Sequence, residues 1–565
     1  MATIRLDRLS VSNKTLIILT LFLSYFAKFV LYRYLVDLDK GLNAWQIIGA
    51  YVILVGVSMI LACIGMRKAK IYASLFVMLI IDIWLIANII YYKSNFFLLD
   101  WQVMIYANNL RGFEDSILVY LQWWYYLIPI STLLIAVFLV AYRKELKQEI
   151  IAVKKYLILL GSGLVIYLAG WGLGAIGNKV YAREHADEWM FNEDKMLFLK
   201  IHSPVGHLGM VTLDAIKDRI LHWQAFKPLT AEEKAIIATI YTDSVAPAAE
   251  PQGHLVFILV ESLESWPLTV HDQDGVEVCE NINNYIRNHD LLLCTNLTSQ
   301  QVYGRSGDGQ LITQTGMLPL SSGVTCMSHG DNVYPNLAHF YPNGIVLNPY
   351  PGVWNQGVTT FSYGFKHLHE VSPFQRGTDS LMIAWAMEEL QRATEPTCLL
   401  VLTLQTHAPF NSVEPTLRLE DNSPENKYLQ TVHNLDKYLG DFFAWADTAD
   451  CMKDATIVIT ADHNHFPVEN GKGLCPLIIK SPNIERKTYI PQAYQMDVFP
   501  TVLHAIGQSN YQWQGFGIDL LAPDANRTIS PKQAYALSDK MIRTNFFKET
   551  MIADVETVSV VPDMN

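Results

Sequence analysis

The sequence predicts a two-part protein: an N-terminal transmembrane domain of five helices, then an extracytoplasmic α/β domain with a mostly parallel central sheet. Two observations lead to this fold class. Five apolar stretches of about 20 residues, the length that crosses a bilayer, all begin before residue 177. After about residue 254, short apolar runs alternate with helical patterns, which is typical of a sheet covered on both faces.

The charge distribution separates the same two parts. Of the 565 residues, 51% are hydrophobic and 17% are charged. Residues 1–176 carry a net charge of +7 and the remainder carries −19, in agreement with −12 for the whole chain. This split excludes one uniform globular body. The acidic larger part argues against a nucleic-acid partner, which favours basic surfaces, and is compatible with a bound cation.

The five predicted spans cover residues 15–36, 45–66, 71–92, 117–141 and 156–177. Lys and Arg gather before the first span, between the second and third, and between the fourth and fifth, as the positive-inside rule requires of cytoplasmic segments. The protein is therefore predicted to be integral to the cytoplasmic (inner) membrane, with everything after residue 177 on its outer side. The long first apolar run, without a small-residue cleavage site, argues against a cleaved signal peptide.

Two charged residues fall inside the predicted spans. Lys28 and Asp82 lie about 20 Å and 17 Å from the inner ends of the first and third spans, at 1.5 Å per residue. Because an unpaired charge at that depth costs several kcal/mol, we expect a structural ion pair rather than a proton or substrate path. The aromatic run 123–126 at the outer end of the fourth span is interpreted as an interfacial anchor.

The rest of the chain divides into three predicted segments. Residues 178–250 are a linker with helices, ended by turn-forming residues; residues 251–525 are the outer α/β domain, and 526–565 are a C-terminal tail. Buried strands are predicted at 255–260, 344–347, 398–404, 456–460 and 477–479, and amphipathic helices at 427–446 and 496–507.

Three of these strands are followed by residues suited to metal binding or proton transfer. Glu261 follows the first, His407 the third, and Asp462-His463 the fourth. Since the carboxyl ends of parallel strands meet at one edge, where active groups gather, we expect these side chains to form a site. A single Glu or His after a strand is more often a solvated loop residue. Carboxylates with an imidazole suit Mn²⁺, Zn²⁺ or Mg²⁺.

Ser306, in the glycine-rich segment 303–310, is the candidate nucleophile. The glycines permit close backbone approach, and a following helix would offer free amides and a positive dipole end to a phosphate. An ordinary helix cap in a glycine-rich turn is the competing interpretation. A serine hydroxyl attacks effectively only once a base or a metal has lowered its pKa.

An ordered set of short motifs resembles the lipoteichoic acid synthase-like membrane phosphotransferases, within the sulfatase and alkaline phosphatase superfamily. The resemblance extends from about residue 254 to 507, and five spans, a linker and an outer α/β domain match the family's architecture. The motifs are Val260-Glu261-Ser262, Gly304-Arg305-Ser306-Gly307-Asp308, Met317-Leu318-Pro319-Leu320, Trp354-Asn355, Thr406-His407-Ala408-Pro409-Phe410, Asp462-His463 and Met496-Asp497-Val498-Phe499-Pro500-Thr501.

The resemblance implies one divalent metal, usually Mn²⁺ in the synthases and Zn²⁺ in related phosphoethanolamine transferases, with Mg²⁺ as a further option. It also implies a membrane phospholipid as donor, a covalent phospho-enzyme, and an envelope glycan or lipid as acceptor. His407 would contact the substrate phosphate or help the leaving group, and Trp354 would line the headgroup pocket. The implied metal ligands are Glu261, Ser306, Asp462 and His463.

Two positions depart from the family pattern. Ser306 stands where the synthases usually have Thr, which retains the hydroxyl. Gln356, a candidate substrate-binding residue, stands where they commonly have Arg after Trp-Asn. A missing guanidinium removes a bidentate phosphate or glycerol contact, so both phosphoglycerol and phosphoethanolamine stay open as the transferred headgroup.

Two other function classes compete. A phosphatase or sulfatase would use water as acceptor, but Asp308 and Gln310 occupy the Pro and Arg positions of the Cys/Ser-x-Pro-x-Arg sulfatase motif. A non-catalytic membrane sensor would be expected to have lost one of the reactive groups, and all are present. Among the neighbours, Asp308 is expected to bind the amides of its own turn, Asp497 to begin a helix, and Glu264 to lie at a helix start.

Overall fold

The computed structural model describes residues 13–64, 70–95, 121–141, 153–184 and 229–241, most of 250–548, and a few positions elsewhere. Gaps after residue 250 are 252, 322, 351–352, 372–377, 412–414, 469–470 and 524. The chain divides into two compact units, Met1–Met104 with Gly112–Arg219, and Ile105–Arg111 with Ile220–Asn565. We describe each unit by itself. Most of the Lys and Arg residues from which the orientation in the membrane was predicted lie outside the described residues.

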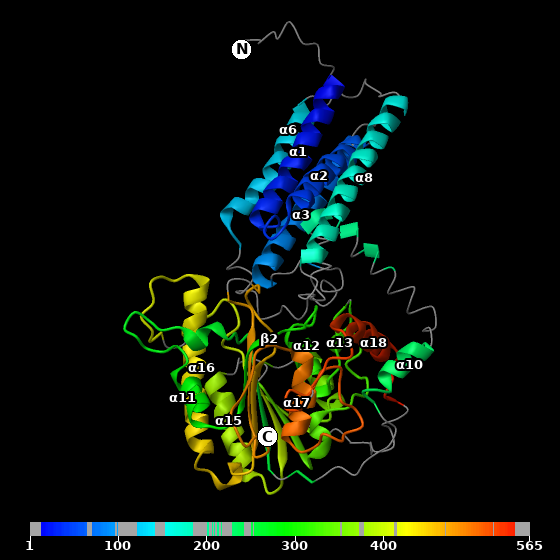
Figure 1. Ribbon diagram of the computed structural model, residues 1–565. Coiled ribbons are helices and arrows are strands. Elements are labelled where there is room, and N and C mark those ends of the chain that lie inside the picture. Colours follow the sequence, from blue (N-terminus) through cyan, green and yellow to red (C-terminus); the bar gives the residue numbers. More distant parts are fainter. Residues whose placement is uncertain are drawn as a thin grey trace. The chain divides into compact units, whose positions relative to one another are not determined.

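The first unit is a bundle of apolar helices (Figure 1). Four of them are long and apolar enough to cross a membrane, in the part of the chain that the structure describes. These four are α1 (Asn13–Leu35), α2 (Ala44–Ile64), α3 (Lys70–Asn95) and α8 (Val153–Glu184).

The prediction of five full-length spans is corrected at the fourth. Its aromatic run forms a 3₁₀ turn, η2 (Trp123–Tyr126), and the helix that follows, α6 (Leu127–Ala141), has 15 residues. At 1.5 Å per residue, the described part of α6 is about 22 Å long, which is less than the ~30 Å hydrocarbon core. The prediction used only the length of the apolar stretch 117–141. Hydropathy does not reveal that residues 123–126 within it form a 3₁₀ turn instead of α-helix.

The predicted intramembrane ion pair is confirmed. Lys28 Nζ on α1 donates to Asp82 Oδ1 on α3, and both side chains are about 2% exposed. Thr132 on α6 accepts from the same ammonium group and donates to the second carboxylate oxygen of Asp82. The pair therefore joins three helices, and each charge has an additional polar partner.

The second unit is built on a nine-stranded mixed sheet in the order β4-β3-β5-β1-β6-β7-β2-β8, with β9 paired to β2. The strands from β4 to β6 run parallel, and β7 is antiparallel to both β6 and β2. The strands are β1 (Leu255–Val260), β2 (Leu292–Thr298), β3 (Asn343–Asn348), β4 (His367–Glu370), β5 (Thr397–Leu402), β6 (Thr456–Ala461), β7 (Cys475–Lys480), β8 (Thr488–Ile490) and β9 (Ala493–Tyr494).

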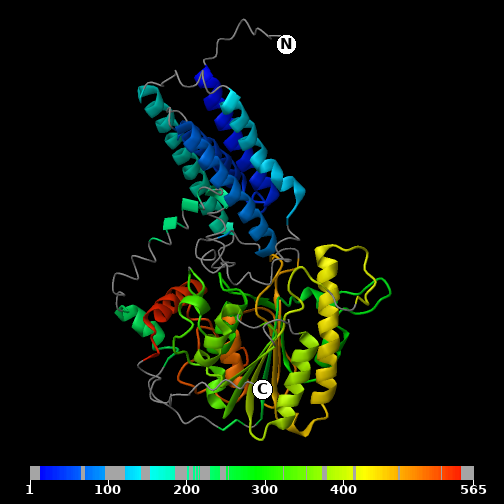
Figure 2. The same cartoon turned by 180° about the vertical axis from the view of Figure 1, so that it is seen from behind.

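Helices cover both faces of this sheet (Figures 1 and 2). The group α11 (Glu280–Asn288), α15 (Asp379–Arg392) and α16 (Pro424–Ala446) lies on one side, and α12 (Ser306–Thr315) with α17 (Val498–Ala505) on the other. Shorter elements are α10 (Ala231–Ile237), α13 (Thr325–Ser328), α14 (Gln356–Ser362), η3 (Trp266–Thr269), η4 (Leu337–Phe340), η5 (Val353–Asn355), η6 (Asp450–Met452) and η7 (Gln495–Asp497). All seven cysteines are free.

The segment after residue 525 contributes a helix to this unit. Helix α18 (Pro531–Thr544) begins at a capping box, in which the Ser530 hydroxyl accepts from the Gln533 amide. Its Ser538 hydroxyl bonds both the amide and the carbonyl of Leu318, just beyond α12. Helix α18 is thus bonded to the segment that directly follows the helix beginning with Ser306.

Strand β1 lies between β5 and β6, and this order positions the candidate site. Val260 pairs with Ala461, so the residues that follow them, Glu261 and Asp462, leave the sheet side by side. Leu259 pairs with Leu402 in β5. The expected meeting of three strand ends at one edge is confirmed.

Candidate active site

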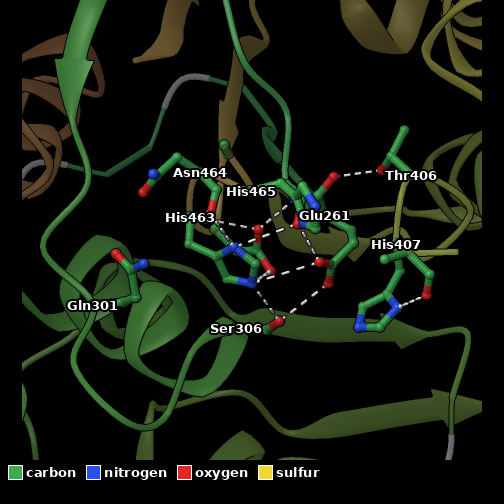
Figure 3. Close-up of polar contacts among 12 residues, drawn as sticks. Glu261, Gln301, Ser306, Thr406, His407, His463, Asn464 and His465 are labelled. Atoms are coloured by element: carbon green, nitrogen blue, oxygen red, sulfur yellow. Dashed lines mark hydrogen bonds and ion pairs between the residues drawn. The ribbon is translucent and has the colours of Figure 1, made fainter. Parts of the chain in front are cut away.

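Four of the predicted site residues converge beyond the ends of β1 and β6. Glu261, Asp462 and His463 each offer a ligand atom within 4.8 Å of the others, and all three are buried. Ser306 Oγ donates to Glu261 Oε2 at 3.1 Å and lies 3.4 Å from His463 Nε2 (Figure 3). His463 Nε2 is in turn 3.5 Å from Glu261 Oε1 and 3.6 Å from Asp462 Oδ2.

Ser306 is the first residue of α12, and its hydroxyl is directed at this cluster. The cap position belongs to Arg305, whose backbone is strained at φ 45°, and no side chain caps the helix. The cap interpretation of Ser306 is therefore wrong. Its hydroxyl lies at a helix N-terminus, where free amides and the dipole favour an incoming phosphate.

Neighbouring hydroxyl groups hold Glu261 in place. Its amide donates to Thr403 Oγ1 at 3.0 Å, and its carbonyl accepts from the Thr406 hydroxyl. Ser262 Oγ donates to Glu261 Oε1 at 2.6 Å, and the Ser262 amide donates to Asp462 Oδ1 at 2.8 Å. Sequence reasoning assigned Ser262 no role, because only the fold reveals its positive φ of 52° and its contacts.

Burial shifts the pKa values of all three groups in the cluster. Burial raises the pKa of Glu261. Burial and the charge of Glu261 raise the pKa of Asp462 well above its usual range. Burial, followed by the positive charge of Arg305, lowers the pKa of His463 well below its usual range. A divalent cation would favour both carboxylates in the charged form and the imidazole in the neutral form that ligates.

The spacing of the donor atoms also fits a metal ion. Ligand bonds of ~2.1 Å in a tetrahedral site imply ligand atoms ~3.4 Å apart. Ser306 Oγ lies 3.1 Å from a Glu261 oxygen and 3.4 Å from His463 Nε2, which is 3.5 Å from the other Glu261 oxygen and 3.6 Å from Asp462 Oδ2. The donor set of two carboxylates, one hydroxyl and one imidazole is hard to borderline, as Mn²⁺ and Zn²⁺ accept.

The remaining predicted site residues, His407, Trp354 and Gln356, lie outside this cluster of contacts. In Figure 3, His407 lies on the opposite side of Ser306 from His463, and its Nδ1 contacts the carbonyl of Ala408. Trp354 lies beside α12, because a Cβ added to Gly307 of that helix would be 3.4 Å from the Cβ of Trp354. Gln356 is buried, and its amide donates to Thr360 within α14 at 3.2 Å.

Two further expectations are confirmed, and one is wrong. Asp308 Oδ2 accepts from the amides of Val302 and Gly304, so it stabilises its own turn. Asp497 lies at the N-cap of α17. Glu264, expected at a helix start, instead bonds the backbone that follows His463.

Two family models match the chain. The lipoteichoic acid synthase N-terminal domain matches residues 1–192, and the sulfatase domain matches residues 323–508, which include His407, Asp462 and His463. The chain thus carries the N-terminal domain of the lipoteichoic acid synthases and a domain of the sulfatase superfamily. Members of this superfamily depend on metal ions, in agreement with the donor set described above.

Characterised relatives extend the similarity over most of the chain. It is 22% identical to lipoteichoic acid synthase 1 of Bacillus subtilis over 562 residues, which cover 88% of this chain and 84% of that protein. It is 21% identical to the lipoteichoic acid synthase of Staphylococcus saprophyticus, covering 80% and 75% respectively. The protein is thus a membrane phosphotransferase of this superfamily.

A solved structure has the same fold over both parts. The integral membrane lipooligosaccharide phosphoethanolamine transferase A of Neisseria meningitidis aligns with 87% of this chain and 96% of its own, at 14% identity and a TM-score of 0.52. The apolar helices and these relatives identify a membrane protein with an extracellular catalytic domain.

Proposed function

We propose that the protein moves a phospholipid-derived headgroup, phosphoglycerol or phosphoethanolamine, through Ser306 to an acceptor in the cell envelope. The observation that carries the proposal is the Ser306 hydroxyl, placed at a helix N-terminus within 3.4 Å of both a buried carboxylate and an imidazole. The names of the relatives, lipoteichoic acid synthases and a phosphoethanolamine transferase, support a lipid donor and an envelope acceptor. The cytoplasmic (inner) membrane is the proposed location.

The reaction takes two displacements at phosphorus. Ser306 Oγ attacks the headgroup phosphate and its hydroxyl proton leaves, while the bond from phosphorus to the diacylglycerol oxygen breaks. That oxygen takes up a proton and diacylglycerol departs. An acceptor hydroxyl then attacks the phosphoserine and loses its proton, and Ser306 Oγ leaves and is reprotonated.

Individual residues have proposed tasks in these steps. Glu261, Ser306, Asp462 and His463 would hold one divalent ion, Mn²⁺ before Zn²⁺ or Mg²⁺, which supplies charge neutralisation at the phosphate and lowers the hydroxyl pKa. His407 contacts the phosphate or protonates the leaving oxygen, and Trp354 lines the headgroup pocket. A direct contact from Gln356 needs its amide to turn from Thr360.

Intact mass measurement tests the proposal. The full chain in detergent is incubated with Mn²⁺ and either phosphatidylglycerol or phosphatidylethanolamine, beside Ser306→Ala. We expect a mass gain that requires the Ser306 hydroxyl, with a size that identifies the headgroup. No adduct from any donor, together with Ser306-dependent phosphate or sulfate release from simple esters, would show a hydrolase and exclude the transferase.

A further inference from the structure

Glu264 lies three residues after Glu261 and outside the metal-ligand cluster, yet its carboxylate is among the most heavily bonded groups near the site. The residue is fully buried, with 0% of its surface exposed. Its Oε1 accepts from the amides of His465 at 3.0 Å and Phe466 at 2.6 Å. Its Oε2 accepts from the amide of Gly473 at 3.1 Å and from Trp266 Nε1 at 2.7 Å.

Three of these four donors belong to the loop between β6 and β7, which begins with Asp462 and His463. The described residues of this loop form no helix or strand, so its buried amides need partners from elsewhere in the fold. Glu264 supplies one acceptor group to amides that lie up to eight positions apart in the chain. It therefore joins two parts of the loop to each other and to the segment that follows β1.

Aromatic packing keeps Glu264 in the same place. Its own amide donates to the Tyr428 hydroxyl at 2.8 Å, and that hydroxyl donates to the carbonyl of Ser262. Rings of Trp266 and Phe466 pack against Tyr428, with centroids 5.7 Å and 5.4 Å from its ring. These contacts restrict movement of the Glu264 carboxylate.

Contacts within the bonded loop orient the His463 ring, together with the Ser262 hydroxyl, which lies 3.4 Å from its Nδ1. The His463 amide donates to Asp462 Oδ1 at 2.7 Å, and its Nδ1 lies 3.0 Å from the carbonyl of Asn464. Asn464 directly precedes His465, which Glu264 holds. A proton on Nδ1 donated to that carbonyl leaves the Nε2 lone pair directed at Ser306 and Glu261.

We propose that Glu264 is a positioning residue for the metal site, which holds the loop that orients His463 so that its Nε2 completes the ligand set. The inference rests on the proposed function of that ligand set. Removal of such supporting contacts usually weakens metal binding 10–100-fold. Both carboxylate oxygens of Glu264 accept from protein donors and lie outside the proposed ligand set, so its loss should act through affinity for the ion and leave the chemistry of the loaded enzyme largely intact.

The test measures the Mn²⁺ dissociation constant of the full chain in detergent, from the paramagnetic resonance signal of the free ion. Glu264→Gln keeps the size but turns an amide NH₂ toward backbone donors, and it should bind Mn²⁺ about 10–100-fold more weakly. Its turnover should recover at saturating Mn²⁺, and the loop 463–474 should exchange amide hydrogen faster.

Asp436→Asn is the matched control. Asp436 is also fully buried and accepts from two backbone amides, those of Asn281 and Ile282, at 2.9 and 2.8 Å. None of these residues belongs to the site, so this variant should lose stability and keep the Mn²⁺ affinity of the wild type. An equal loss of affinity in both variants overturns the proposal, because a general loss of stability would then explain it.

Glu264→Asp provides a second route if Glu264→Gln does not fold. It retains the charge on a side chain one methylene shorter, and it should also weaken Mn²⁺ binding. Wild-type affinity in either folded variant overturns the positioning role. Failure of the wild type itself to bind Mn²⁺ contradicts the proposed metal site instead, so the two failures are distinguishable.

Discussion

Backbone strain is concentrated around the candidate nucleophile. Seven non-glycine residues in the described part of the chain have a positive φ, and five of them flank the site: Ser262, Arg305, Trp354, Asn355 and Phe410. Each such residue costs roughly 1–2 kcal/mol relative to the right-handed regions. Strain of this kind persists where surrounding contacts over-determine the backbone, which is typical of functional sites.

At Ser306 the hydroxyl group itself is the functional requirement. Ser306→Thr retains the nucleophilic oxygen, whereas Ser306→Ala removes it. We expect headgroup transfer by the Thr variant to stay within roughly 10-fold of the wild type, and the Ala variant to lose on the order of 10³-fold or more. Radiolabelled headgroup transfer measures both. Equal loss in the two variants would mean that the hydroxyl is not the attacking group.

Asp379 gives the catalytic unit a pH-dependent contribution to stability. Burial raises the pKa of this carboxyl to about 6, and the amides of Leu404 and Gln405 only partly offset the effect. The unfolded pKa is about 3.9, so between pH 4 and 6 the folded state binds more protons. The free energy of unfolding therefore falls as pH rises through this window.

Asp379→Asn removes this titration. We expect the melting temperature of the wild type, relative to the variant, to decrease from pH 4 to pH 6, by an amount that corresponds to roughly 2 kcal/mol at most. Thermal unfolding of both proteins in detergent at four pH values provides the comparison. A constant difference across that range would show that Asp379 titrates normally in the folded protein.

Helices α2 and α8 pack with their backbones in contact, because glycines occupy the positions where the two helices face each other. A Cβ on Gly56 would lie 2.6 Å from the Tyr167 amide nitrogen and 2.7 Å from the Gly163 oxygen. A Cβ on Gly172, also in α8, would meet nothing within 4 Å. Small residues that permit such close contact are a main source of helix association in membranes.

Gly56→Leu should force the two helices apart, and Gly172→Leu should be tolerated. We expect the first variant to unfold in detergent at a clearly lower temperature, and the second to melt as the wild type does. Size-exclusion profiles after stepwise heating compare the three proteins. Equal melting temperatures for both variants would show that the glycine contacts contribute little.

The Lys28–Asp82 ion pair should contribute to the stability of the helical bundle. Because removing one partner leaves a buried charge uncompensated, Lys28→Ala should destabilise more than Lys28→Ala combined with Asp82→Ala. The retained hydroxyl of Thr132 can satisfy only one hydrogen bond of an unpaired carboxylate. A double-mutant cycle on melting temperature measures the coupling, and additive effects would contradict a paired role.

Strands buried on both faces were predictable because they produce continuous apolar runs, as Leu255–Val260 does. Strand β4, with the sequence His-Leu-His-Glu at the sheet edge, carries no such signal. Glu261 and Asp462 were predictable because they directly follow buried strands, whereas Ser306 was found from its glycine-rich segment. The contacts of Glu264 and Ser262 were not predictable, because they join segments about 200 residues apart, and no local pattern encodes those distances.

At the scale of the whole molecule, metal binding should control the stability of the catalytic unit. Glu261 and Asp462 are buried carboxylates with raised pKa values, so their charged forms are disfavoured until a cation is present. A ligand that binds only the folded state adds about 2.7 kcal/mol at 100 times its dissociation constant. Removal of metal by EDTA should therefore lower the melting temperature of the full chain, and Mn²⁺ should restore it.

Asp462→Asn separates this effect from nonspecific actions of EDTA. The substitution removes one of the two facing carboxylates, so the metal-free variant should melt above the metal-free wild type and respond little to Mn²⁺. Asp436→Asn, whose carboxylate lies among α11 residues, should still gain stability with Mn²⁺ as the wild type does. Identical responses of the Asp462 variant and the wild type would place the stabilising ion elsewhere, because a site built on this carboxylate pair cannot survive the loss of one charge unchanged.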